Sequence, residues 1–148
     1  SAGGETLFRV IEDDTDAILA AANVVITASG TATVQTALHG TPMVIVYRVS
    51  PLTYRLLRRL VRVKNIGMVN LIAGEKIVPE LIQEAFTPAT VAAEAISMLT
   101  DQGRVSRIRA GLARVREKLG GPGASRRAAE AILTIADKSA ATTTRTRE

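Results

Sequence analysis

The chain has no cysteine and no tryptophan, and it has a single histidine in 148 residues. Without cysteine it can form neither a disulfide nor a thiolate metal site, and one histidine excludes a metal site built from several histidines. The lack of disulfides and of a visible signal peptide is typical of a protein from the reducing cytoplasm. We therefore expect a cytoplasmic protein that carries no metal and no cofactor.

Aromatic residues are also scarce, and long apolar runs are missing. Aromatic side chains make up 3% of the residues while hydrophobic residues make up 47%, so the core must be aliphatic. No apolar run approaches the roughly 18 residues that a membrane-spanning helix requires. A chain of this length corresponds to about one domain. These features favour a single α/β or α domain without a transmembrane segment.

Charge is distributed unevenly along the chain. Residues 1–51 contain two basic and five acidic side chains, whereas residues 52–148 contain 17 basic and nine acidic ones. Such a basic excess suits nucleic acid, anionic lipid or phosphorylated substrates. A nucleic-acid-binding domain is the least favoured of these, because aromatic residues for base stacking are nearly missing and no helix-turn-helix or RNA-binding motif is present.

Short β-branched segments alternate with helical patterns in the first third of the chain. Continuous apolar strands joined by short helices are typical of a parallel sheet with both faces covered. The order is strand, helix, strand, helix, strand, and the expected elements are 6–11, 13–23, 24–29, 31–40 and 41–48. The fold class is therefore α/β, a Rossmann-like parallel sheet with flanking helices, followed by C-terminal helices after Pro88.

Small residues are concentrated where the second expected strand passes into a helix, in "ASGTATVQTALHGTP". Ser29, Gly30, Thr31, Ala32 and Thr33 lie at the carboxyl edge of the expected sheet, where open α/β folds bind ligands. Free N–H groups and hydroxyls at the positive end of a helix favour a phosphate. The alternative, which this spacing leaves open, is a tight turn with an ordinary helix cap.

A wider pattern extends this stretch, and it closely resembles one family. The recurring motifs are Ser29-Gly30-Thr31-Ala32, Gly40-Thr41-Pro42, Tyr47-Arg48, Ser50-Pro51-Leu52-Thr53, Asn70-Leu71, Ala73-Gly74 and Pro79-Glu80-Leu81. They resemble the C-terminal half of bacterial lipid-A-disaccharide synthases, glycosyltransferases with the GT-B fold. The resemblance implies a domain that binds the donor UDP-diacylglucosamine, from which a diacylglucosamine unit passes to a lipid monosaccharide phosphate acceptor.

The resemblance also implies which residues contact the UDP-sugar. They are Ser29, Gly30, Thr31, Ala32, Thr33, Gln35, Arg48, Asn70 and Gly74, with Asn70 and Gly74 expected in a loop. Gln35 departs from the family pattern, which usually has a glutamate that binds the ribose hydroxyls, so a non-catalytic nucleotide-binding module stays open as an alternative. The general base is expected in an N-terminal domain that this sequence does not include, so we expect the chain alone to be inactive.

The expected domain organisation follows the composition. Residues 1–4 are expected to be a linker or tag, residues 5–138 an incomplete donor-nucleotide-binding domain with C-terminal helices, and residues 139–148 a disordered tail, because that segment is polar and patternless.

Residues 52–64 predict an amphipathic basic helix. On a helical wheel Arg55, Arg58, Arg59 and Arg62 fall on one side and the leucines on the other. Such a helix either rests on an anionic membrane surface or presents a solvated face of an ordinary domain helix. The first interpretation places the protein at the inner face of the inner membrane, as a peripheral protein.

We predict that replacing both Arg58 and Arg62 by glutamate lowers the fraction of protein that sediments with vesicles containing anionic lipid. Each basic residue near such a surface contributes about 1 kcal/mol of binding, and charge reversal adds repulsion. Affinity for UDP serves as the control and is expected to stay unchanged. Equal sedimentation of variant and parent would show that the segment has only a structural role.

Overall fold

The computed structural model describes residues 8–50, 66–121 and 123–145, with side chains up to residue 136. Its elements, in chain order, are α1 (Thr15–Ala21), β1 (Val25–Ala28), α2 (Thr31–His39), β2 (Met43–Tyr47), α4 (Met68–Ala73), β3 (Glu80–Ile82), the 3₁₀ turn η1 (Gln83–Ala85), α5 (Pro88–Thr100), α6 (Gln102–Leu119) and α7 (Ala124–Arg145). The described residues up to Val115 form one compact unit, and those from Arg116 onward form a second.

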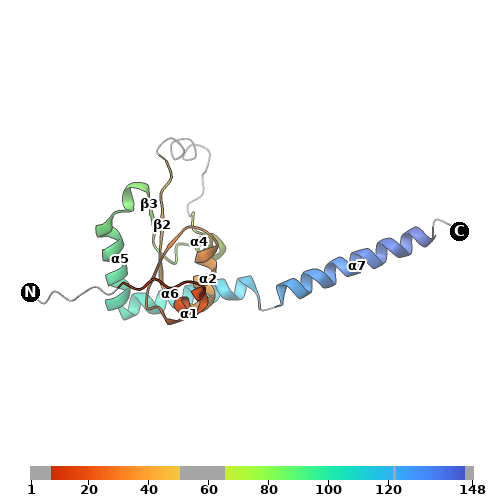
Figure 1. Ribbon diagram of the computed structural model, residues 1–148, viewed down its shortest axis with the longest axis horizontal. Coiled ribbons are helices and arrows are strands. Elements are labelled where there is room, and N and C mark those ends of the chain that lie inside the picture. Colours follow the sequence, from red (N-terminus) through yellow and green to blue (C-terminus); the bar gives the residue numbers. More distant parts are fainter. Residues whose placement is uncertain (1–7, 51–65, 122, 146–148) are drawn as a thin grey trace, which may run out of the picture. The chain divides into compact units, whose positions relative to one another are not determined.

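The strands of the described chain form one parallel sheet in the order β1-β2-β3. Val25 pairs with Met43 and Ala28 with Val46, while Ile45 pairs with Glu80 and Tyr47 with Ile82. In the view of Figure 1, α5 lies on one side of the strands, and α2 with α4 on the other. The sequence predicted this helix-flanked parallel sheet, and the α/β, Rossmann-like fold class is confirmed.

The core is aliphatic, as the composition predicted. Met43, Val44 and Ile45 of the central strand are at most 1% exposed. The strands β1 and β3 pair with its two edges, and helices pack on its faces. Leu112 and Val115 of α6 are completely buried within the same cluster. One face of α6 therefore closes the core over the sheet.

The helix α2 ends where the sequence placed its end. Gly40 is the C-cap, with φ 70° and ψ 17°, and its N–H donates to the carbonyl groups of Ala37 and Thr36. This left-handed conformation is favourable for glycine because it lacks a Cβ. The Gly40-Thr41-Pro42 motif therefore ends the helix and returns the chain into β2.

Two strand predictions are wrong. Residues 8–11 of the expected first strand form no strand, and Phe8 and Val10 are each 89% exposed, so no described neighbour covers them. The strand β1 was expected to be buried on both faces, but Ile26 is 53% exposed. Hydrophobic β-branched residues indicate strand propensity but cannot specify which faces are covered.

Two segments that were not expected to be helical form helices. Residues 70–73 belong to the short helix α4 and not to a loop, and α7 continues to Arg145, into the segment predicted as a disordered tail. Adding a residue to a formed helix is far less costly than starting one, and the sequence after Ala124 contains neither glycine nor proline up to this point. Polarity alone was therefore a poor guide to the end of α7.

No helix in the described ranges is long and apolar enough to cross a membrane. The predicted basic helix with Arg55, Arg58, Arg59 and Arg62 lies outside the described residues.

Candidate functional site

The parallel sheet brings three polar residues to one edge. Ser29 follows β1, Arg48 follows β2 and Gln83 follows β3, and the strands they follow are paired in register. The backbone N–H of Ser29 donates to Val46 O at 3.2 Å, which joins the ends of β1 and β2. The carboxyl edge of such a sheet is where α/β folds bind ligands, so these residues define the candidate site.

The turn from β1 into α2 is open. An added Cβ at Gly30 would have no heavy atom of the described residues within 4 Å. Thr31 and Ala32 are exposed in the first turn of the nine-residue helix α2, where backbone N–H groups have no partner inside the helix. Neither residue donates to another described residue. This end of α2 can therefore offer N–H groups and a partial positive charge to an anion.

The hydroxyl of Thr33 does not face this open space. Thr33 is completely buried, and its Oγ1 donates to Gly30 O at 2.7 Å. Thr36, one turn on, is buried in the same way and donates to Ala32 O at 2.8 Å. Both threonines hold the start of α2 together, and a direct contact between Thr33 and the donor stays a prediction.

Gln35 is exposed on α2, one helical turn after Thr31. Its amide makes no hydrogen bond with the described part of the chain. The side chain is therefore free to reach a ligand bound at the start of the helix.

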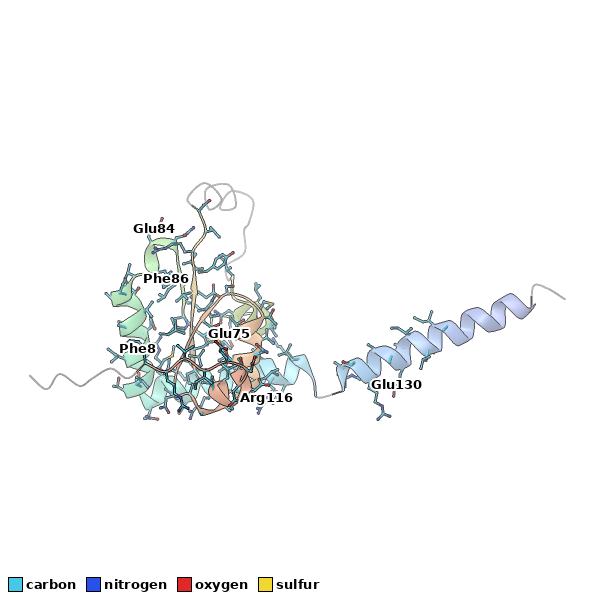
Figure 2. The ribbon with its side chains drawn as sticks, viewed as in Figure 1. Phe8, Glu75, Glu84, Phe86, Arg116 and Glu130 are labelled. Carbon is cyan, nitrogen blue, oxygen red and sulfur yellow. The ribbon has the colours of Figure 1, made fainter. Side chains whose placement is uncertain are left out.

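Arg48 is held at the end of β2 by the turn after β3, on which Figure 2 labels Glu84 and Phe86. Its Nη2 donates to Phe86 O at 2.7 Å, and its guanidinium carbon lies 5.2 Å from the centroid of the Phe86 ring. A guanidinium has five N–H donors, so most remain available for an anion. Gln83, which follows β3, also joins the chain that follows β2, because its Nε2 donates to Val49 O at 3.2 Å.

Asn70 is completely buried, and its amide is fully occupied within the chain. Nδ2 donates to Val78 O at 2.9 Å and to Glu80 Oε1 at 2.7 Å. Oδ1 accepts from the N–H groups of Ile77 and Val78, at 2.9 and 3.1 Å. Asn70 therefore fixes the segment that leads into β3, and its predicted contact with the donor would require one of these bonds to be exchanged.

Glu80 extends this network to the start of α4. Its carboxylate accepts from Ile66 N at 2.9 Å and from Gly67 N at 3.0 Å. Ser29 Oγ donates to Ile66 O at 3.4 Å, so the same segment also touches the β1–α2 turn. An added Cβ at Gly67 would lie 2.5 Å from Ile45 Cδ1, so a larger residue there would require the side chain of Ile45 to shift.

Two further residues have local roles. Gly74, which was expected to contact the donor from a loop, is the left-handed C-cap of α4. His39 pairs with Asp16, Nε2 to Oδ1 at 3.0 Å, and lies at the end of α2 away from the candidate site.

Sequence reasoning missed the roles of Glu80, Gln83 and Phe86. Glu80 belongs to the Pro79-Glu80-Leu81 motif, so a signal was present, but nothing in the motif indicates that a carboxylate would accept three hydrogen bonds. Phe86 is one of two phenylalanines, and this scarcity was the only signal for it.

The fold defines a Rossmann-like domain whose carboxyl edge is the candidate ligand site. Residues 5–135 match the family model described as lipid-A-disaccharide synthetase, and the chain belongs to this family.

Relatives from several bacteria agree with this membership, and each is named lipid-A-disaccharide synthase. The chain is 47% identical to the protein of Geobacter metallireducens over 129 residues, which are 87% of this chain and 34% of the relative. It is 43% identical to that of Trichlorobacter lovleyi over 137 residues, 93% of this chain and 36% of the relative. For Acidobacterium capsulatum the identity is 48% over 112 residues, 76% and 28%. The chain thus spans about a third of the length of these relatives.

We predict that Asn70→Ala lowers the free energy of unfolding by about 2 kcal/mol, because it leaves the buried N–H of Val78 and the partly buried N–H of Ile77 without an acceptor. Alanine is the best helix former, so any loss cannot be assigned to the helix propensity of α4. Urea unfolding measures the change, and Leu71→Ala on the exposed face of the same helix is the matched control.

The Asn70→Asp variant gives an independent check. It keeps the acceptor for Ile77 and Val78 but places a second carboxylate beside Glu80, which raises the pKa of the pair. Its stability deficit relative to the parent should therefore be larger at pH 7 than at pH 4. A deficit that does not change with pH would contradict the hydrogen bond between positions 70 and 80.

Proposed function

We propose that this chain is the donor-binding part of a glycosyltransferase of lipid A synthesis, the C-terminal half of a GT-B fold. The reaction would move a diacylglucosamine unit from UDP-2,3-diacylglucosamine onto a lipid monosaccharide phosphate. Family membership supports a nucleotide-sugar donor and a lipid acceptor. The observation that carries the proposal is the open start of α2 at the carboxyl edge of the sheet, where Gly30 faces free space and Thr31 and Ala32 present unpaired N–H groups.

The pyrophosphate of UDP would bind at the start of α2. Ser29 and Gly30 supply a turn without large side chains, and the N–H groups of Thr31 and Ala32 donate to phosphate oxygens. Arg48, fixed on Phe86, would add a charged donor from the neighbouring strand end. Gln35, one turn along α2, would reach the ribose with its amide. Thr33, Asn70 and Gly74 would act mainly by holding these groups in place.

The chemistry assigned to this chain is to hold and orient the donor. Positioning alone can account for about 7–11 kcal/mol of barrier reduction when both reactants are held in reacting geometry. We assign no general base to the described residues, since His39 is paired with Asp16 at the other end of α2. The anomeric carbon of the donor would be presented to an acceptor bound by another part of the enzyme.

The lipid substrates also support a peripheral location at the inner face of the inner membrane. The basic segment with Arg55, Arg58, Arg59 and Arg62 would provide the contact with anionic headgroups. This location is part of the proposal and depends on the vesicle experiment given above.

We predict that Ala32→Glu abolishes UDP binding while Ala32→Gln weakens it little. A glutamate in the first turn repels the pyrophosphate, yet it stabilises the helix itself by about 0.3–1 kcal/mol. Loss of binding therefore cannot come from loss of fold, which thermal unfolding of both variants checks. Calorimetry measures UDP affinity, and equal affinities for the two variants would place the phosphates elsewhere.

We predict that Gln35→Glu tightens UDP binding by about tenfold, because hydrogen bonds to a charged acceptor are worth about 1.5–3 kcal/mol against about 1 kcal/mol for neutral ones. Titration with 2′-deoxyuridine 5′-diphosphate is the control, since the gain in affinity from Gln35→Glu should be smaller when one ribose hydroxyl is absent. An unchanged or weaker affinity of Gln35→Glu for UDP would show that residue 35 does not face the ribose.

A further inference from the structure

A second concave site lies at the opposite edge of the sheet from the candidate donor site. It is a pocket of about 320 Å³ lined by the segment before β3, by α5 and by α6. Ile77 and Ile108 are among its apolar lining residues, and Lys76, Arg104, Arg107 and Glu94 supply its charges. Because residues 76–79 precede β3, the pocket belongs to the amino edge of that strand, whereas Ser29, Arg48 and Gln83 follow the carboxyl ends of theirs.

The charges of this pocket are only partly paired. Arg104 is committed, because it forms an ion pair with Glu94 and its Nη1 donates to Ser97 Oγ at 2.8 Å. The neighbouring carboxylate of Glu75 is paired with Arg114 at 2.6 Å. Lys76 and Arg107 make no hydrogen bond or ion pair with any described residue. The pocket lining therefore includes two cations, Lys76 and Arg107, that pair with no described residue.

We propose that this pocket binds a phosphate monoester whose organic part is about the size of one sugar. A phosphate monoester carries about 1.5 to 2 negative charges at pH 7, which matches the two free cations, whereas a single carboxylate would neutralise only one. Arginine and lysine are the side chains that commonly bind phosphate, the first by a fork of N–H donors and the second as a point charge. The volume lies at the lower end of the range for small-molecule sites, so the organic part must be small.

The test titrates the 148-residue chain with glucose 1-phosphate at low ionic strength, by calorimetry and by NMR. Saturable binding is expected, with shifts at Lys76 and Arg107, and none with glucose alone. Lys76→Ala and Arg107→Ala should each weaken binding by about tenfold, since each removes a charge-assisted contact. Arg109→Ala is the matched control, because Arg109 is exposed on the same helix, about 200° around its axis from Arg107, and does not line the pocket.

A gain of affinity provides a further check. Glu94→Gln should tighten binding of glucose 1-phosphate, because it removes a repelling carboxylate and releases Arg104 from its ion pair. Saturating UDP should leave the affinity for glucose 1-phosphate unchanged, since the two sites lie at opposite edges of the sheet. Three results would each overturn the proposal. The first is competition between UDP and glucose 1-phosphate, and the second is the absence of saturable binding to both glucose 1-phosphate and the vesicles described next. The third is a loss of affinity in Arg109→Ala equal to that in Lys76→Ala and Arg107→Ala.

The phosphate can come from a free metabolite or from a lipid of which only the phosphate and the group next to it enter the pocket, and vesicles separate these sources. Phosphatidylcholine vesicles with and without phosphatidic acid are sedimented with the parent chain and with the same variants. A lipid source predicts binding that requires phosphatidic acid and falls in Lys76→Ala and Arg107→Ala but not in Arg109→Ala. A free metabolite predicts that these variants change glucose 1-phosphate binding only.

Discussion

The carboxylate of Glu80 is the contact on which the arrangement of the candidate site depends. It stands at the start of β3 and accepts hydrogen bonds from Ile66 N, Gly67 N and Asn70 Nδ2. These bonds fix the start of α4 against the sheet and serve it as a cap from a distant part of the chain. The carbonyl of Ile66, placed in this way, accepts from Ser29 at the turn into α2. The carboxylate of Glu80 on β3 thus positions, through Ile66, the turn that follows β1.

The two edges of the sheet have different chemistry for a geometric reason. At the carboxyl edge, the strands end in small or hydrogen-bonding residues and a helix begins there, so backbone N–H groups are exposed. At the amino edge, charged side chains from α5 and α6 surround the segment before β3. Backbone donors favour a ligand that lies close to the main chain, whereas long cationic side chains can adapt to ligands of different shape. The proposed UDP and phosphate monoester sites use these two kinds of recognition.

Much of the fold could be predicted from the sequence, because local signals and tertiary structure agree there. Met43 to Tyr47 is a β-branched run at the centre of the sheet, and Gly40 ends α2 with the conformation that glycine favours. Prediction was wrong where exposure depends on neighbours, as at Phe8 and Ile26. For the candidate site, the position of Ser29 to Ala32 followed from the strand–helix order. The hydrogen bonds of Asn70 and the contact between Arg48 and Phe86 did not, because they join residues that are distant in sequence or lack any periodic signal. The donor contacts themselves stay predictions.

The close approach at Gly67 restricts how the sequence can change over time. The space that a side chain at position 67 would need is already filled by Ile45 Cδ1, 2.5 Å from an ideal Cβ, and by Glu80 Oε1 at 3.0 Å. Shortening residue 45 alone would remove one obstacle and open a void in the core, while the carboxylate of Glu80 would still be in the way. A larger residue at position 67 would therefore require the side chains of Ile45 and Glu80 to move, or these residues to change with it. The three positions therefore depend on one another for packing, even though none of the three residues is assigned a contact with the donor.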